Sequence, residues 1–161
     1  MRAAVITVSD SRARGEGEDL SGEAVAAMLT AAGIKVAYTA LIPDEGEDIR
    51  RTIVACADEQ RLDLIITTGG TGVSPRDVTP DVTRELIERD VPGMAEAMRA
   101  ASMRVTPFAM ISRAVAGIRS RSLILNLPGS PKAARENLAV VLPVLSHAVA
   151  KIRSDETPCA R

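Results

Sequence analysis

Short apolar runs alternate with helix-like patterns along most of this chain of 161 residues. The run at residues 3–9 is apolar along its length, as strands buried on both faces of a parallel sheet are. Further strands are expected at residues 34–42, 62–68, 115–118 and 123–127. Strands that alternate with helices favour an α/β fold, here a three-layer, mostly parallel β-sheet with helices on both faces.

The predicted helices begin at residues that commonly cap helix N-termini. Asp19, Thr79 and Ser130 are each expected to act as an N-cap, and a proline follows both Thr79 and Ser130 in the first turn. The helices are expected at about residues 19–32 and 47–60, from 79, from 92, and from 130 to 152. We predict a single domain over residues 1–153 and a flexible C-terminal tail over residues 154–161, because the tail is polar and terminal.

Composition and charge exclude several classes of protein. No apolar run approaches the ~20 residues of a membrane-spanning helix, and the first apolar run is too short for a signal peptide. We therefore expect a cytoplasmic protein with no membrane association. The net charge is −1 and the basic residues are scattered, while Tyr38 and Phe108 are the only aromatic residues. A nucleic-acid partner is not expected, because both a basic surface and stacking platforms are missing from the sequence.

The cysteine and histidine content argues against a zinc site. Cys56 and Cys159 form no CxxC pair, and His147 is the only histidine. Cys56 falls in a predicted helix and is expected in the core. Any metal ion would be held by oxygen atoms, and this favours magnesium.

The least ordinary segments of the chain follow the predicted strands. They comprise residues 9–11, 42–45, 67–77 and 126–132. The carboxyl ends of parallel strands lie at one edge of a sheet, where α/β proteins bind their ligands. We therefore expect these loops to converge on one crevice.

The segment at residues 67–77 contains three glycines within residues 69–72. Such glycines either let the backbone approach an anionic ligand or simply supply the φ angles of a tight turn. Neighbouring side chains favour the ligand, since hydroxyl groups and one cation accompany the glycines at Thr68, Thr71, Ser74 and Arg76. Neither a Walker A motif nor a complete GxGxxG motif is present, so a P-loop NTPase and a dinucleotide-binding Rossmann domain are disfavoured.

Two carboxylates, Asp44 and Asp77, lie in these loops. A pair of carboxylates beside bound phosphates suits a magnesium ion that neutralises developing charge. The structural alternatives are a turn residue for Asp44 and an Arg76 partner for Asp77. Ser130 and Lys132 similarly suggest either a second anion site at a helix N-terminus or a cap beside a solvated lysine.

Taken together, these segments resemble the MogA/MoaB family of molybdenum-cofactor biosynthesis proteins. The resemblance rests on TVSD at 7–10, IPDE at 42–45, TTGGTG at 67–72, PRDVTPD at 75–81, PG at 92–93, PFAMISR at 107–113, AGIR at 116–119 and LNLPGSPK at 125–132. It implies a molybdopterin-binding α/β fold and a homotrimer. It also implies magnesium-dependent transfer of AMP from ATP to the terminal phosphate of molybdopterin, with release of pyrophosphate. The adenylated product would then pass to the molybdate-insertion protein.

The resemblance also assigns residues. Asp44 and Asp77 match the catalytic carboxylates of the family and are the expected magnesium ligands. The expected substrate-binding residues are Ser9, Asp10, Thr68, Gly69, Gly70, Thr71, Gly72, Ser74, Ser112, Arg113, Asn126, Pro128, Gly129 and Ser130.

Two other functions stay open at this point. A non-catalytic, molybdopterin-binding accessory protein of the MoaB type would share the same motifs, although it would not need both carboxylates. A receiver-type signalling domain would use Asp10 and Asp44 near strand ends, but it does not account for the loop at residues 67–72.

Overall fold

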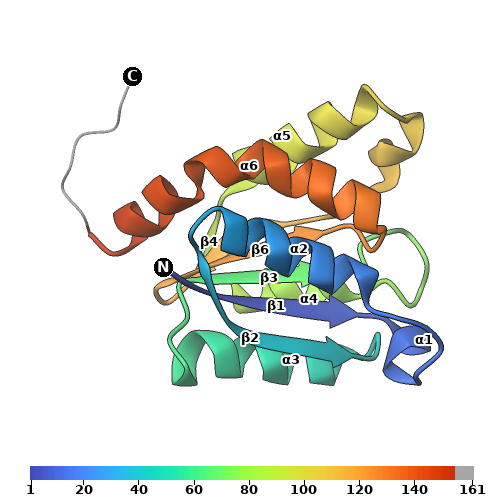
Figure 1. Cartoon of the computed structure of the whole chain (residues 1–161), viewed down its shortest axis with the longest axis horizontal. Helices are drawn as coiled ribbons and strands as arrows, with labels where there is room; N and C mark the ends of the chain where they lie inside the picture. The colour runs from blue at the N-terminus through green and yellow to red at the C-terminus, as the bar shows by residue number, and fades with distance from the viewer. Residues whose placement is uncertain (155–161) are drawn as a thin grey trace.

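A six-stranded β-sheet forms the middle layer of the computed structural model, which describes residues 1–154 (Figure 1). The strands are β1 (Arg2–Val8), β2 (Lys35–Ile42), β3 (Leu64–Thr68), β4 (Arg89–Asp90), β5 (Ala116–Arg119) and β6 (Ser122–Leu127). Their order across the sheet is β2-β1-β3-β6-β5-β4. The first four strands in this order are parallel, while β5 runs antiparallel to both of its neighbours. The predicted α/β fold with a mostly parallel sheet is confirmed.

Helices cover both faces of the sheet (Figure 1). One face carries α2 (Leu20–Ala31), α5 (Pro92–Met103) and α6 (Pro131–Ile152), and the other carries α3 (Gly46–Val54), its π-helical continuation η1 (Ala55–Glu59) and α4 (Thr79–Leu86). The short elements α1 (Asp10–Ala13), η2 (Pro107–Ile111) and β4 were not predicted, because so few residues show no clear periodicity. Apart from Ser154, the tail that was expected to be flexible lies outside the described residues.

None of the helices described between residues 1 and 154 is both long enough and apolar enough to cross a membrane.

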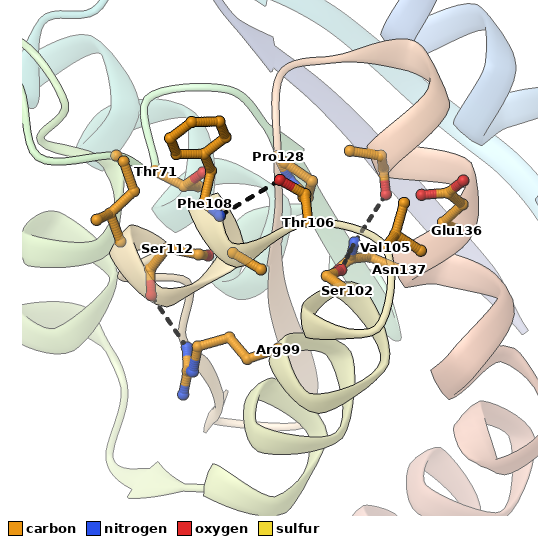
Figure 2. A pocket seen from close by; sticks show the side chains of 14 residues that line it. Thr71, Arg99, Ser102, Val105, Thr106, Phe108, Ser112, Pro128, Glu136 and Asn137 are labelled. Carbon is orange, nitrogen blue, oxygen red and sulfur yellow. Dashed lines mark hydrogen bonds between the residues drawn. The ribbon is translucent and has the colours of Figure 1, made fainter.

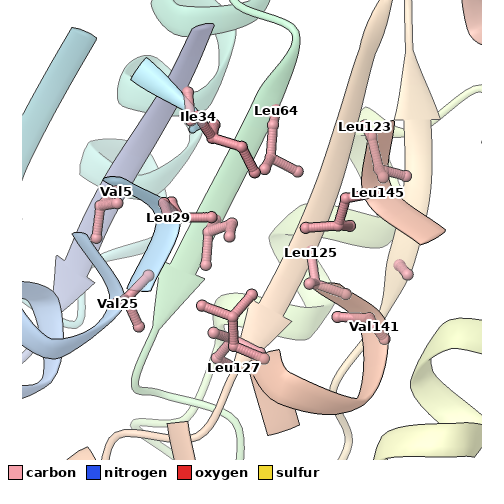
Figure 3. Packing of buried hydrophobic residues seen from close by; sticks show 14 of the residues in the cluster. Val5, Val25, Leu29, Ile34, Leu64, Leu123, Leu125, Leu127, Val141 and Leu145 are labelled. Atoms are coloured by element: carbon pink, nitrogen blue, oxygen red, sulfur yellow. The ribbon is translucent and has the colours of Figure 1, made fainter. Parts of the chain in front are cut away.

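Two hydrophobic cores form because successive strand side chains point to opposite faces of the sheet. Val5 and Leu64 pack under α2, α5 and α6 in the first core, which Figure 3 shows. Ile6 and Ile65 pack against α3 and α4 in the second. Each such side chain stabilises the fold by roughly 1.5–3 kcal/mol through burial. Cys56 lies in the second core, as expected, and burial raises the pKa of its thiol to about 11.

Two of the three predicted N-caps are observed. The Asp19 carboxylate accepts a hydrogen bond from Gly22 N at 2.9 Å, and Ser130 caps α6. The prediction for Thr79 was wrong, because Val78 occupies the N-cap position and makes no side-chain bond. The Thr79 amide donates to Gly70 O at 3.2 Å, so that Thr79 is the first residue of α4 rather than its cap.

The parallel strands end side by side, and Gly69 is where they are most crowded. It follows β3 with φ of +106°, and its amide donates to Leu127 O at 3.1 Å. A Cβ atom at Gly69 would stand 2.1 Å from the carbonyl oxygen of Val8 at the end of β1. Only glycine lets the chain leave β3 at this point, since a side chain would push the ends of β1 and β3 apart.

We predict that Gly69→Ala destabilises the protein by at least about 3 kcal/mol, because the new methyl group meets a backbone atom that cannot rotate away. Gly33→Ala is the matched control, since Gly33 also has positive φ, at +75°, but nothing lies within 4 Å of its Cβ position. Its substitution should cost only the roughly 1–2 kcal/mol of left-handed backbone strain. Urea unfolding of both variants measures the difference, and equal losses would contradict the proposed crowding at Gly69.

Candidate active site

A polar crevice of about 220 Å³ opens beyond the carboxyl ends of β1, β2, β3 and β6. It is lined by Thr7, Val8, Ser9, Arg12, Ser21, Asp44, Thr68, Gly69, Gly70, Asp77 and Gly129. Residues from all the strand-end loops thus meet at one place, as the alternation of strands and helices predicted.

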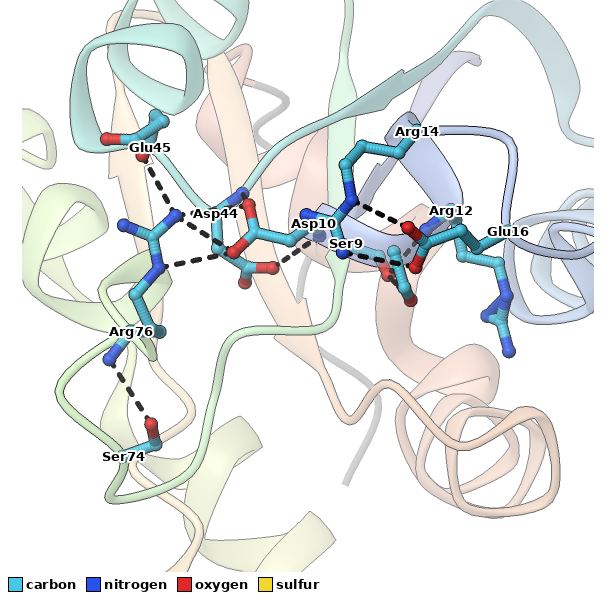
Figure 4. A network of polar contacts seen from close by, with 10 residues as sticks. Ser9, Asp10, Arg12, Arg14, Glu16, Asp44, Glu45, Ser74 and Arg76 are labelled. Atoms are coloured by element: carbon cyan, nitrogen blue, oxygen red, sulfur yellow. Dashed lines mark hydrogen bonds and ion pairs between the residues drawn. The ribbon is translucent and has the colours of Figure 1, made fainter.

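Two aspartates tie the loops after β1 and β2 together. The backbone amide of Asp10 donates to Asp44 Oδ2 at 2.8 Å, and the amide of Asp44 donates to Asp10 Oδ1 at 3.0 Å (Figure 4). A further backbone bond of 2.9 Å joins Ser9 N to Ile42 O. The carboxylate of Asp44 is therefore held in a fixed place by groups at the ends of two neighbouring strands.

Arg76 joins the loop after β3 to the same network. Its guanidinium contacts Asp10 at 2.9 Å and Glu45 at 2.8 Å (Figure 4). The cation that accompanies the glycines is thus paired with two carboxylates of the protein, Asp10 and Glu45. The alternative that Asp77 pairs with Arg76 was wrong, since Asp77 Oδ2 instead accepts a hydrogen bond from Ser74 N at 2.8 Å.

These contacts shift the two neighbouring carboxyl groups in opposite directions. The amide of Asp44 and then the Arg76 guanidinium lower the pKa of Asp10 below its usual value. Burial raises the pKa of Asp44, and the nearby negative charges of Asp10 and Asp77 add to this against the opposing hydrogen bond from the Asp10 amide. Asp44 is thus a carboxylate whose negative charge the surrounding protein does not fully compensate.

The glycines of the loop leave room beside both candidate catalytic carboxylates. A Cβ atom at Gly70 would stand 3.0 Å from Asp44 Oδ1, and one at Gly72 would stand 2.9 Å from Asp77 Oδ2. Gly70 also has positive φ, at +61°. The positive φ of Gly69 and Gly70 agrees with the explanation that the glycines supply the angles of a turn, and Gly70 and Gly72 also leave space next to the carboxylates.

The donor set at the crevice fits a magnesium ion. Magnesium takes hard oxygen ligands and is commonly bound by one or two carboxylates together with substrate phosphates. Asp44 and Asp77 supply such oxygens, and Gly70 and Gly72 leave space in front of them. Within residues 1–154, no group of three or more His, Cys, Asp or Glu side chains could hold a metal ion. A cation here would need oxygens from a substrate as well.

Arg113 holds the glycine loop in shape. Its Nε donates to Gly72 O at 2.7 Å, and its terminal nitrogens bind the Asp81 carboxylate at 2.8 and 2.9 Å as well as Asp77 O. Its backbone amide donates to Thr71 O at 2.9 Å. The structure therefore places Arg113 behind the loop as a support, and its partner Asp81 was not identified from the sequence.

Asn126 is another predicted site residue that lies behind the crevice. Its side chain is fully buried, accepts from Val115 N at 3.1 Å, and donates to Thr67 and Thr83 hydroxyls at 2.9 and 3.0 Å. Ser130 caps α6, and Lys132 lies 3.9 Å from Glu136 in an exposed ion pair. These contacts give the segment after β6 a structural role at the edge of the crevice.

A second, apolar cavity of about 260 Å³ adjoins the glycine loop (Figure 2). Four predicted residues line it, namely Thr71, Gly72, Ser112 and Pro128. Its other walls come from α5, η2 and α6, with Arg99, Ser102, Val105, Thr106, Phe108, Ala109, Ile111, Ala133, Glu136 and Asn137. The sequence motif at 107–113 drew attention to Ser112 and Arg113 alone, although Phe108 was one of only two aromatic residues in the chain.

The predicted residues thus fall into three groups. Ser9, Asp44, Thr68, Gly69, Gly70, Asp77 and Gly129 line the polar crevice, and Thr71, Gly72, Ser112 and Pro128 line the apolar cavity. Asp10, Ser74, Arg113, Asn126 and Ser130 line neither space and instead hold the surrounding loops.

A mostly parallel α/β domain with a polar crevice beyond its strand ends, flanked by an apolar cavity, has the architecture of a small-molecule-binding protein. The chain belongs to the family described as probable molybdopterin binding domain, which matches residues 4–147. The resemblance to MogA and MoaB proteins is therefore confirmed.

Individual relatives are similar over most of the chain. The Helicobacter pylori (strain ATCC 700392 / 26695) protein named molybdopterin adenylyltransferase is 40% identical over 147 residues, which cover 90% of this chain and 84% of that protein. The protein of the same name from Haemophilus influenzae is 43% identical over 140 residues, covering 86% and 71%. The crystal structure of the molybdopterin biosynthesis enzyme MoaB from Thermus thermophilus matches with a TM-score of 0.90 and 51% identity, covering 95% and 96%.

We predict that neutralising Asp44 and neutralising Asp10 change stability in opposite directions. With divalent cations chelated, Asp44→Asn should raise the free energy of unfolding at pH 7, because it removes a carboxylate whose ionisation the fold disfavours. This gain should disappear as the pH falls below the unfolded-state pKa of aspartate, about 3.9.

Asp10→Asn should lower the free energy of unfolding at pH 7, because the fold favours the ionised form of Asp10. This loss should shrink as the pH falls through the lowered pKa of Asp10. Urea unfolding of both variants between pH 3 and pH 8 measures the two effects. If both variants change the free energy of unfolding in the same direction at pH 7, the fold does not favour the ionised form of Asp10 while disfavouring that of Asp44.

Proposed function

We propose that this protein is a molybdopterin adenylyltransferase of molybdenum-cofactor biosynthesis. It transfers AMP from ATP to the terminal phosphate of molybdopterin in the presence of magnesium and releases pyrophosphate. The observation that carries the proposal is the meeting of Asp44, Asp77 and the glycine loop in one crevice of a molybdopterin-binding domain. Two relatives that are 40% and 43% identical to this chain, over 90% and 86% of its length, carry the name of this enzyme.

The carboxylates and the loop have distinct roles in this proposal. Asp44 and Asp77 would hold the magnesium ion, whose charge would offset the negative charge that develops on the transferring phosphate. The backbone of the loop at residues 69–72 lies beside both carboxylates and positions the phosphates of the substrates. Asp10, Arg76 and Arg113 keep the loops in place through the contacts described above.

The proposed chemistry does not require a protein nucleophile. The terminal phosphate of molybdopterin attacks the α-phosphate of ATP, a new phosphoanhydride bond forms, and pyrophosphate leaves with the electrons of the bond that breaks. Such transfers depend on positioning and charge neutralisation. The raised pKa of Asp44 agrees with a group whose ionised form a bound cation would stabilise.

The apolar cavity beside the loop is the proposed seat for a ring of one substrate. It shares Thr71 and Gly72 with the glycine loop, so a ring bound there lies next to the phosphate region. Phe108 and Pro128 offer flat apolar surfaces (Figure 2). The side-chain nitrogen of Asn137 already donates to Ser102 Oγ and Ala133 O, so its side-chain oxygen is the atom that offers a polar contact. A pterin or an adenine combines such a flat face with a polar edge.

The alternative function is a non-catalytic, molybdopterin-binding accessory protein of the MoaB type. The Thermus thermophilus structure named MoaB, at 51% identity, is the observation that favours it. The presence of both Asp44 and Asp77 in the crevice favours catalysis, because a protein that only binds the pterin needs no magnesium ligands.

We also propose that the protein forms a homotrimer and passes its adenylated product to the molybdate-insertion protein. Exposed apolar side chains cluster in the segment at 103–111, with Met103, Val105, Phe108, Met110 and Ile111 all at least 42% exposed. Such a cluster is typical of a surface that contacts another protein chain. A cytoplasmic location stays a prediction.

The first experiment incubates the purified protein with molybdopterin, ATP and magnesium and measures adenylated molybdopterin and pyrophosphate. We expect both products, and we expect Asp44→Asn and Asp77→Asn each to lower the rate by at least about a hundredfold, because charge stabilisation in the transition state is lost. Binding of molybdopterin itself should be largely spared.

Asp90→Asn is the control, since Asp90 is an exposed carboxylate on β4 at the far edge of the sheet. Normal rates in both crevice variants would remove Asp44 and Asp77 from the mechanism. Tight molybdopterin binding without any AMP transfer by the unaltered protein would instead support the accessory function.

We predict that Met110→Asp converts the trimer to monomers, because it places a charge within the proposed contact surface while altering a side chain that is 65% exposed in the single chain. Val144→Asp on the exposed side of α6 should leave the assembly unchanged. Sedimentation velocity of the three proteins measures the masses. A trimer that persists in Met110→Asp would place the contact surface elsewhere.

A further inference from the structure

One buried hydroxyl group near the crevice has no hydrogen-bond partner. Among the buried side-chain oxygen and nitrogen atoms of residues 1–154, Oγ1 of Thr79 is the one without a partner. The Thr79 side chain is fully buried. An unsatisfied buried hydroxyl is costly and is seldom kept without a reason.

The position of this hydroxyl relates it to Asp44. Thr79 Oγ1 lies 2.4 Å from the point where a Cβ atom of Gly70 would stand, and Asp44 Oδ1 lies 3.0 Å from the same point. Because Gly70 has no side chain, the two oxygens face one small space. Asp44 Oδ2 accepts the Asp10 amide, whereas no residue within 1–154 donates to Asp44 Oδ1.

Thr83, one turn further along α4, is a threonine in the same helix whose hydroxyl group does have hydrogen-bond partners. It is also fully buried, but its hydroxyl donates to Thr79 O at 2.8 Å and accepts from Asn126 Nδ2 at 3.0 Å. Thr79 has the same shape and the same burial without either kind of partner. Valine would fill the place of Thr79 equally well and would leave no polar atom unpaired.

We propose that Thr79 is a positioning residue of the loaded site, and that its hydroxyl finds its partner only when ligand is bound. The partner is an oxygen atom that enters the space beside Gly70, either a water molecule on the cation or a phosphate oxygen of the nucleotide. Thr79 and Asp44 then hold neighbouring oxygens of the ligand from two sides of this space. The inference rests on the proposed function, because it needs a ligand of this kind in the crevice.

Glycine at position 70 is part of the same arrangement. Any side chain there would meet the Thr79 hydroxyl and the Asp44 carboxylate at once. The amide of Thr79 also donates to Gly70 O at 3.2 Å, so the start of α4 and the glycine loop are held at a fixed spacing. The space between the two oxygens is thus defined by backbone contacts.

The test uses Thr79→Val, which removes the hydroxyl and keeps the shape, and Thr79→Ser, which keeps the hydroxyl. In urea unfolding without ligand, Thr79→Val should raise the midpoint, because it removes an unsatisfied buried group. Thr83→Val is the matched control and should lower the midpoint, because it breaks two hydrogen bonds.

Calorimetric titration then measures the affinity for three probes, namely manganese ion alone, a non-hydrolysable ATP analogue alone, and the two together. We expect Thr79→Val to bind each probe that supplies this oxygen about tenfold more weakly than the unaltered protein does. A tenfold loss of affinity is about what the loss of one hydrogen bond to a charged group produces. Thr79→Ser should stay within about twofold of the unaltered protein. A loss with manganese alone assigns the oxygen to the cation's water, and a loss only with the analogue assigns it to a phosphate.

Three results would overturn the inference. If Thr79→Val lowers both the unfolding midpoint and the affinity, the hydroxyl has a structural role. If Thr79→Val binds every probe as well as the unaltered protein does, the hydroxyl has no partner in the loaded site and the inference alone fails. If the unaltered protein binds none of the probes, the proposed function fails and the inference fails with it.

Discussion

The parallel pairing of β1, β2, β3 and β6 is the constraint on which the rest of this structure depends. It brings the ends of strands that are far apart in the sequence to a common edge. The crowding at that edge is severe enough that the chain leaves β3 through Gly69, against the carbonyl oxygen of Val8. The crevice exists because these strand ends are adjacent. Its polar lining comes from the loops that follow the four parallel strands.

Charge is distributed unevenly within these loops. Arg76 and Arg113 direct their guanidinium groups to carboxylates and carbonyl oxygens of the protein itself, so they fix loop geometry. Asp44 accepts one backbone hydrogen bond and pairs with no arginine within 1–154. The arrangement therefore leaves the negative charge of Asp44 only partly compensated, beside Asp77 and next to open space, and this agrees with the cation site that we propose.

Much of this could be predicted from the sequence because it is local. The strands follow from apolar runs, and Asp19 and Ser130 mark the starts of their helices by side-chain capping. Long-range pairing could not be read in the same way: nothing near Arg76 in the sequence indicates that Asp10, 66 residues away, would neutralise it. For Thr79, the hydrogen bond of its amide to Gly70 shifts the helix start by one residue, and this tertiary contact overrides the usual capping pattern. The apolar cavity was missed because α5, η2 and α6 form it only after they pack.

The ion pairs of Arg76 with Asp10 and Glu45 are exposed to solvent, unlike the hydrogen bonds between backbone and carboxylate that fix Asp44. Dissolved salt screens exposed ion pairs within a Debye length and hardly affects buried contacts. We therefore expect a rise in ionic strength to weaken the contacts of Arg76 more than the partly buried hydrogen bond that holds Asp44. The position of the loop after β3 thus depends on the salt concentration more than the position of Asp44 does.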